Sequence, residues 1–272
     1  MKINHRQSGM SLLEEVLVIA IIAVVIFFAL PAARQLFNSL ETPAGTKSLI
    51  SSALASARAI ASREQQYVGI RFQHACYIDE QGNIQPNQSP LKMPQYMIFV
   101  KYQPPKQAQN NDNHVFVAIE GIEPIKLPEN IGVMDMVINK NQMISSDADI
   151  DSDTKLLDTT SFFIVFSPSG KLSVQESQTR NKNGYASSAV GISEDDIFNI
   201  EEQVEKGYAK FVQDENGIAG LEQEPSRRAF IIYDRNILRS LHEAKRYSRY
   251  LEDLKNREMI YINPYTGTFI NK

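Results

Sequence analysis

The sequence predicts an α+β fold: a long N-terminal helix, membrane-spanning in its first half, packed on an antiparallel β-sheet head. Residues 16–30 are all apolar, and apolar residues then recur at helical spacing up to residue 63. The rest of the chain holds short β-branched or aromatic runs between Gly, Pro, Asn and Asp. These observations divide the chain into a polar N-terminal segment (1–9), an apolar helix (10–31), its amphipathic continuation (32–65) and a β-rich head with helical insertions (66–272).

Composition sets the first limits on function. With 272 residues, 43% of them hydrophobic, the chain can bury a sizeable core in one or two domains. Its net charge of −4 argues against a protein that coats nucleic acid by bulk charge. The single cysteine, Cys76, excludes an internal disulfide framework and a cysteine-rich zinc site.

The N-terminal apolar segment is long enough to cross a bilayer only if it includes two acidic residues. The fully apolar run has 15 residues, whereas the stretch from Met10 to Leu30 has 21 residues, or about 31 Å as a helix. That stretch contains Glu14 and Glu15. A carboxylate within the membrane costs about 2.5–3.5 kcal/mol, so this helix requires a partner for its charge.

Two ordinary interpretations of this segment explain it poorly. A cleavable secretory signal needs small residues at a cleavage site after the apolar run. In the sequence from Leu30 to Arg34, Leu or Pro occupies a position where a small residue is needed. An uncleaved anchor explains the basic N-terminal flank through the positive-inside rule. It leaves Glu14 without an explanation.

The segment Ser8-Gly9-Met10-Ser11-Leu12-Leu13-Glu14, followed by the apolar run, resembles the processing signature of type IV pilins and type II secretion pseudopilins. The resemblance implies that a prepilin peptidase cleaves between Gly9 and Met10 and N-methylates Met10. It also places the family's assembly glutamate on Glu14 and its helix-kinking proline on Pro31. Glu15 departs from the pattern, because the family usually has an apolar residue there.

Physical chemistry is consistent with these implied roles. Cleavage would expose a positively charged amine on Met10, which could pair with Glu14 of a neighbouring subunit and offset the cost of burying that carboxylate. A carboxylate that snorkels or is protonated at the membrane interface is the alternative for Glu14. Pro31 lacks an amide hydrogen and is expected to kink the helix.

Later segments resemble the minor-subunit branch of the same family. They are the alanine-rich helix around Arg58, the hairpin Phe162–Val174 with its Ser167-Pro168-Ser169-Gly170 turn, and the closing turn Asn263–Gly267. The resemblance implies a minor pilin or pseudopilin, not an enzyme, that primes or caps a filament of a type II secretion or type IV pilus system.

The same resemblance implies a location and partners. The protein would be a single-pass protein of the bacterial inner membrane, with a cytoplasmic N-terminus and a periplasmic or extracellular head. Its partners would be the prepilin peptidase, other pilin or pseudopilin subunits and inner-membrane lipid. Two alternatives stay open: a minor pilin for DNA uptake, and a tethered binding or hydrolytic domain that carries a pilin-like leader.

The head is expected to be mainly strands. Residues 176–226, with a short helix expected over Glu194–Lys206, are interpreted as an insertion, and so is the helix that follows them, Asn236–Arg257, capped by Asn236. The expected strands are Tyr67–Phe72, Tyr96–Tyr102, His114–Glu120, Ser161–Ser167, Lys171–Gln175, Ala229–Tyr233 and Glu258–Ile262.

An alternating acidic loop is the candidate metal site. Asp147, Asp149, Asp151 and Asp153 could converge on calcium, which prefers carboxylate oxygens. An EF-hand loop, however, would have glycine where Ser152 stands. A solvated acidic loop without a cofactor is the alternative.

A basic segment and four histidines complete the candidates. Residues 225–258 hold nine Lys or Arg against five acids, a local charge of +4, which suits either a DNA-contacting face or a solvated surface. Overall composition makes nucleic acid the less favoured partner. The histidines, His5, His74, His114 and His242, have no metal-ligand spacing.

Overall fold

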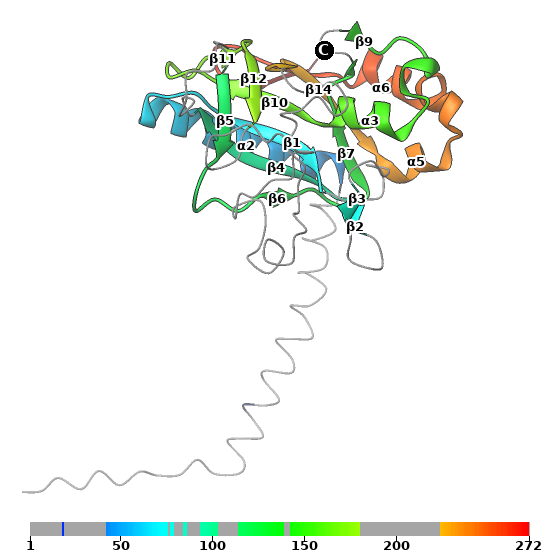
Figure 1. Ribbon diagram of the computed structural model, residues 1–272, viewed down its shortest axis with the longest axis horizontal. Helices are drawn as coiled ribbons and strands as arrows, with labels where there is room; N and C mark the ends of the chain where they lie inside the picture. Colours follow the sequence, from blue (N-terminus) through cyan, green and yellow to red (C-terminus); the bar gives the residue numbers. More distant parts are fainter. Residues whose placement is uncertain are drawn as a thin grey trace, which may run out of the picture.

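The computed structural model describes residues 42–75, 77–78, 84–85, 93–102, 114–138, 142–179 and 224–271, together with Val18 (Figure 1). The residues predicted to serve in processing and assembly, Gly9, Met10, Glu14 and Pro31, lie outside the described residues. So do Cys76 and the expected helix Glu194–Lys206.

Helix α2 (Pro43–Glu64) opens the described chain. Thr42 caps it, with its hydroxyl accepting a hydrogen bond from the amide of Gly45 at 3.1 Å, and a proline in the first turn suits a position that needs no amide hydrogen. The helix ends where Gln65 adopts a left-handed conformation with φ 53°. Its buried face consists of Thr46, Ile50, Ala53, Leu54, Ala57 and Ala61.

The prediction of a long N-terminal helix that is apolar in its first half is wrong for the structure described. The described chain is mostly antiparallel sheet, and its first long helix is the amphipathic, 22-residue α2. Thr42 has an extended backbone, with φ −92° and ψ 157°, so α2 begins at this residue and does not continue an earlier helix. The segment 10–41, apart from Val18, lies outside the described residues.

The predicted localisation is also contradicted. Among the described residues, no helix combines the length and the apolar character that crossing a bilayer requires. Helix α2 has sufficient length, but Lys47, Arg58 and Arg63 interrupt its sequence. The expectation of a single-pass inner-membrane protein is corrected on this finding.

The main sheet has eight strands, in the order β11-β10-β1-β4-β5-β12-β13, with β6 beside β4. All its pairings are antiparallel except that of β12 with β5. Helix α2 packs across β1 and β10. The strands are β1 (Val68–His74), β4 (Gln95–Tyr102), β5 (His114–Ala118), β6 (Ile125–Lys126), β10 (Phe162–Phe166), β11 (Leu172–Ser173), β12 (Glu176–Thr179) and β13 (Glu224–Pro225).

The main sheet curves so that β13, at one end of the strand order, comes next to β10, near the other end. Strand β13 leads into Ser226 and Arg227, whose hydroxyl and amide bond to the backbone of Val165 and Phe163 in β10, each at 2.8 Å. The enclosed face buries Arg71, with its guanidinium 4.4 Å from the centroid of the Phe163 ring. The apolar side chains on this face are Tyr96, Ile98, Val100, Phe116, Ala118, Phe163 and Val165.

A second sheet of four strands, in the order β16-β15-β14-β7, also packs against α2. Its inner face shares one hydrophobic core with α2 and the main sheet, including Ile232, Ile260 and Ile262. Two small hairpins, β2–β3 and β8–β9, form separate two-stranded sheets. The bounds are β7 (Ile131–Met134), β14 (Ala229–Asp234), β15 (Ile260–Ile262), β16 (Phe269–Asn271), β2 (Tyr77–Ile78), β3 (Ile84–Gln85), β8 (Val137–Ile138) and β9 (Gln142–Met143).

Short helices cover the outer face of β7 and β14 and gather at one end of the molecule (Figure 1). They are η1 (Asp147–Ile150), α3 (Asp153–Thr160), α5 (Arg235–Ser240), η3 (Glu243–Lys245), η4 (Tyr247–Leu251) and α6 (Glu252–Arg257).

The expected single helix Asn236–Arg257 is wrong in two respects. Leu241 is extended, with φ −85° and ψ 141°, so the segment breaks into four short helical pieces, of which η4 is a π-helix. The cap of the first piece is Asp234, whose carboxylate accepts hydrogen bonds from the amides of Asn236 and Ile237. The seven expected strands, by contrast, each overlap a strand of the structure.

One amide side chain joins the two sheets. The Gln95 carboxamide accepts from the Val133 amide at 2.7 Å and donates to the Val133 carbonyl at 2.8 Å and the Thr160 carbonyl at 2.7 Å. The side chain therefore acts as a peptide group at the edge of β7. All these groups are buried, so the three hydrogen bonds are costly to lose.

Replacing Gln95 by Met is expected to lower the free energy of unfolding by about 3–5 kcal/mol, because three buried backbone groups lose their partner. Urea unfolding of the two proteins measures the difference. The matched control, Gln142→Met, changes an exposed glutamine and is expected to stay within about 0.5 kcal/mol of the parent. A loss at Gln95 no larger than that of the control contradicts this role.

Candidate functional site

Arg58 connects α2 to two turns that lie more than one hundred residues away in sequence. Its Nε donates to the Gly170 carbonyl at 2.8 Å and its Nη2 to the Tyr265 carbonyl at 3.3 Å. We call Arg58, the turn Ser167–Lys171 and the turn Asn263–Thr268 the Arg58 junction. A planar guanidinium suits this task, because its fixed donors can bind two carbonyls at once.

Both turns depend on a glycine where the chain passes close to α2. Gly170 has φ +71° and Gly267 has φ +70°, a conformation that other residues adopt at a cost. A Cβ on Gly170 would lie 2.8 Å from the Ser62 hydroxyl, and one on Gly267 would lie 3.2 Å from Cδ of Arg58. The glycines therefore supply both the turn geometry and the close approach.

The two turns also contact one another. The Leu172 amide donates to the Pro264 carbonyl at 2.8 Å, and the Lys171 amine lies 5.7 Å from the centroid of the Tyr265 ring. The junction therefore brings together three segments that sequence analysis identified separately. It ties the helix, the main sheet and the second sheet into one unit.

A groove of about 390 Å³ lies beside the junction. The outer face of α2 forms one wall and the turn after β15 forms the other, so apart from Arg58 the groove is lined by small side chains. Its lining residues are Ser51, Ala55, Arg58, Ala59, Ser62, Thr266, Gly267 and Thr268.

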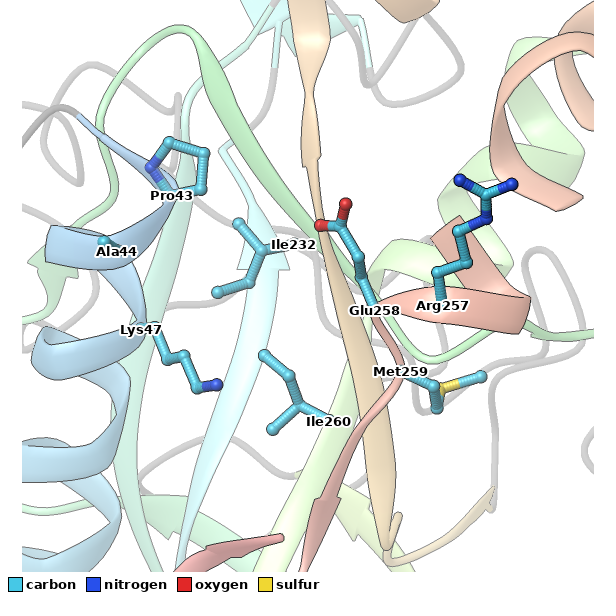
Figure 2. A pocket seen from close by; sticks show the side chains of 8 residues that line it. All are labelled: Pro43, Ala44, Lys47, Ile232, Arg257, Glu258, Met259 and Ile260. Carbon is cyan, nitrogen blue, oxygen red and sulfur yellow. The ribbon is translucent and has the colours of Figure 1, made fainter. Parts of the chain in front are cut away.

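A second pocket, of about 280 Å³, lies at the beginning of α2 (Figure 2). Ile232 and Ile260 form its apolar base, Lys47 extends toward them from α2, and the Glu258 carboxylate stands on the opposite wall. Arg257 points away in Figure 2 and pairs with Asp253 at 2.9 Å. The pocket can accept an apolar side chain between charges of opposite sign, and no sequence motif indicated it because its walls come from distant segments.

The four aspartates of the acidic loop have different structural roles and partners. Asp147 Oδ1 accepts from the amides of Tyr247 and Ser248 at 2.8 and 3.0 Å, 100 residues along the chain. Asp149 Oδ2 accepts from the amides of Ser145 and Ser146. Asp151 pairs with Lys155 at 2.7 Å, and Asp153 begins α3.

These contacts bear on the calcium hypothesis. The hydrogen bonds to Asp149 from Ser145 and Ser146 lower the pKa of its carboxyl. At Asp147, desolvation raises the pKa, but the hydrogen bonds from Ser248 and Tyr247 outweigh it and the pKa falls below its usual value. In the part of the chain that the structure describes, no three His, Cys, Asp or Glu side chains are grouped to hold a metal ion. Calcium binding at this loop remains an untested prediction.

The basic segment 225–258 contributes much of its charge to the fold. Arg227 pairs with Asp135 at 2.6 Å in the interior, and Arg235 is buried and donates to the carbonyls of Glu129 and Met93. Arg246 is only 5% exposed and lies 3.8 Å from Glu243. Three of the nine cations are thus buried side chains with partners inside the protein, which weakens the case for a DNA-contacting face.

The histidines remain apart in the described structure. His5 lies outside the described residues, His114 begins β5, and His242 Nδ1 accepts from the Ala244 amide at 3.3 Å. His74 is buried on β1, where its Nδ1 lies 3.0 Å from the Met93 carbonyl that also binds Arg235. Desolvation, reinforced by the Arg235 charge, lowers the pKa of His74 to about 3.

Comparison of the chain with family models, with curated proteins and with solved structures found no match.

Arg58→Ala is expected to lower the free energy of unfolding by about 1–3 kcal/mol, because two hydrogen bonds to turn carbonyls are lost. Chemical denaturation measures the change. Arg63→Ala is the matched control on the same helix, since Arg63 is 73% exposed and pairs with its neighbour Glu64; it is expected to cost less than about 0.5 kcal/mol. Equal losses in both variants would exclude a structural role for the junction.

Stability is expected to fall as the pH is lowered below about 6.5, because the unfolded chain can protonate His74 and the folded chain, with a pKa of about 3, cannot. By pH 5 this single group should cost about 2 kcal/mol relative to pH 8. His74→Gln removes the titration and should flatten the profile between pH 6.5 and 5. Urea unfolding at several pH values tests this, and identical profiles for the two proteins would refute it.

Proposed function

We propose that this chain is a minor pilin or pseudopilin, a structural subunit that primes or caps a filament of a type II secretion or type IV pilus system. In this proposal prepilin peptidase removes residues 1–9 and N-methylates Met10. The observation that carries it is the fixed spacing of Gly9, Met10, Glu14 and Pro31 around one apolar run. Four positions in one register are more specific than any single motif.

Charge pairing explains why that spacing would matter. Removal of the leader creates a cation at Met10, four residues before Glu14. A carboxylate packed among apolar side chains is unfavourable unless a cation and hydrogen bonds compensate it. If Glu14 of one subunit meets Met10 of the next, the pair forms only in the correct axial position, and assembly becomes specific as well as favourable.

The Arg58 junction, which lies in the part of the chain that the structure describes, also supports the proposal. A filament subunit must hold its head in a constant orientation relative to the segment through which it assembles. Helix α2 begins at Pro43, after the predicted assembly segment 10–31, and Arg58 fixes this helix to turns from both sheets. The hydrophobic core that α2 shares with the two sheets also holds the helix in a fixed position against them.

The surfaces beside α2 fit a protein partner. The groove next to the junction and the pocket at the start of the helix both present apolar or small side chains with nearby charges. The residues that line them are suited to contacts with neighbouring subunits, which are the partners that the proposal requires.

The proposal is tested by following processing and incorporation separately. Mass spectrometry of the mature protein is expected to show a chain that begins at Met10 and carries one added methyl group. Glu14→Val should be processed in the same way but should fail to enter filaments, because the Met10 amine loses its partner. Quantitative immunoblotting of sheared filaments measures incorporation.

Glu15→Val is the matched control, because it removes the neighbouring carboxylate and leaves the proposed pair intact. It is expected to be processed and incorporated as the parent is. A mature chain that retains residues 1–9 would exclude the processing step. Normal incorporation of Glu14→Val would exclude the charge pair.

A further inference from the structure

The four-stranded sheet has one closed edge and one open edge. At β7 the Gln95 carboxamide satisfies both backbone groups of Val133. At the other end β16 pairs with β15, and none of the described strands pairs with its outer side. Open edges of this kind accept a further strand unless charge, proline or a covering element prevents it.

The direction of the backbone groups on β16 follows from its register. The Asn263 amide donates to the Thr268 carbonyl at 2.8 Å, and Tyr261 stands opposite Ile270. Because hydrogen-bonded and non-hydrogen-bonded positions alternate in an antiparallel ladder, Thr268 and Ile270 face β15. Phe269 and Asn271 therefore direct their backbone N–H and C=O groups toward the open edge.

The side chains near this edge are apolar and exposed. Ile270 is 46% exposed and its cross-strand neighbour Tyr261 is 38% exposed, whereas Ile260 and Ile262 on the opposite face are buried. Strand β16 carries no charged residue and no proline between positions 269 and 271. Two of the devices that keep an edge strand from pairing, charge and proline, are thus absent from these three residues, and the short length of the strand is the remaining one.

We propose that β16 pairs antiparallel with β16 of a second copy of this chain, with Ile270 on the two-fold axis. In that arrangement Phe269 of each copy forms a hydrogen-bonded pair with Asn271 of the other, so all the outward backbone groups are satisfied symmetrically. The two Ile270 side chains meet at the axis and Tyr261 flanks each of them. No like charges face one another, because the pairing segment is uncharged.

The short length of this pairing limits the strength of the contact. Three residues from each copy bury far less than the roughly 1,200 Å² of a stable interface, so the pairing is weak and requires a high local concentration of the chain. At the axis the two Ile270 residues form a non-hydrogen-bonded pair, with Cα atoms about 4.5 Å apart. That separation is within the range that a disulfide spans.

Disulfide trapping tests this pairing on the full-length chain. Ile270→Cys in a Cys76→Ser background has one cysteine, and mild oxidation is expected to yield a covalent dimer, read by non-reducing electrophoresis. Tyr265→Cys in the same background is the matched control, since Tyr265 is 68% exposed but lies in the turn away from the axis. It is expected to remain monomeric under the same conditions.

A third variant separates strand pairing from random collision. Adding Asn271→Pro to Ile270→Cys removes an amide that faces outward and donates no hydrogen bond to β15, so it should abolish the dimer while circular dichroism stays unchanged. Equal crosslinking of Ile270→Cys and Tyr265→Cys overturns the proposal. So does the absence of a dimer, a dimer that persists with Asn271→Pro, or capture of a different protein. The leader and Glu14 play no part in this test.

Discussion

The Arg58 guanidinium, which donates to the carbonyls of Gly170 and Tyr265, holds the remaining architecture in place. Helix α2 is amphipathic, and burial of one face would still allow it to slide or rotate over a sheet. Two directional hydrogen bonds from one side chain to two different turns remove that freedom. The direct bond between Leu172 and Pro264 then makes the positions of the two turns depend on each other.

Polar side chains elsewhere in the molecule also link segments that are distant in sequence. Gln95 completes the edge of β7, and Asp147 caps the segment at Tyr247 from 100 residues away. The buried pair of Arg227 and Asp135 adds an ionic contact between the last third of the chain and its middle. Such long-range polar contacts specify one arrangement of elements among the many that hydrophobic burial alone would permit.

The sequence predicted local features of this fold better than long-range ones. Seven strands followed from residue alternation and turn residues, whereas the start of α2 at Pro43 did not, because a helix was expected to run on through residues 32–65. The break at Leu241, the parallel pairing of β12 with β5 and the edge contact of Gln95 did not, because each depends on partners distant in sequence. At the junction, sequence analysis identified the three segments, but their convergence on Arg58 became visible only in space.

The curved main sheet has a consequence for the order in which the molecule loses structure. Its last strand pair, β12 with β13, has only two residue pairs, and this end of the sheet meets β10 through two hydrogen bonds, from the Val165 amide to the Ser226 hydroxyl and from the Arg227 amide to the Phe163 carbonyl. Strands β1, β4 and β10 are joined by ladders of five and seven residue pairs, so they form the more stable part of the sheet. The seam at Ser226 and Arg227 is therefore expected to open early, giving solvent deuterium its first access to the enclosed face around Arg71.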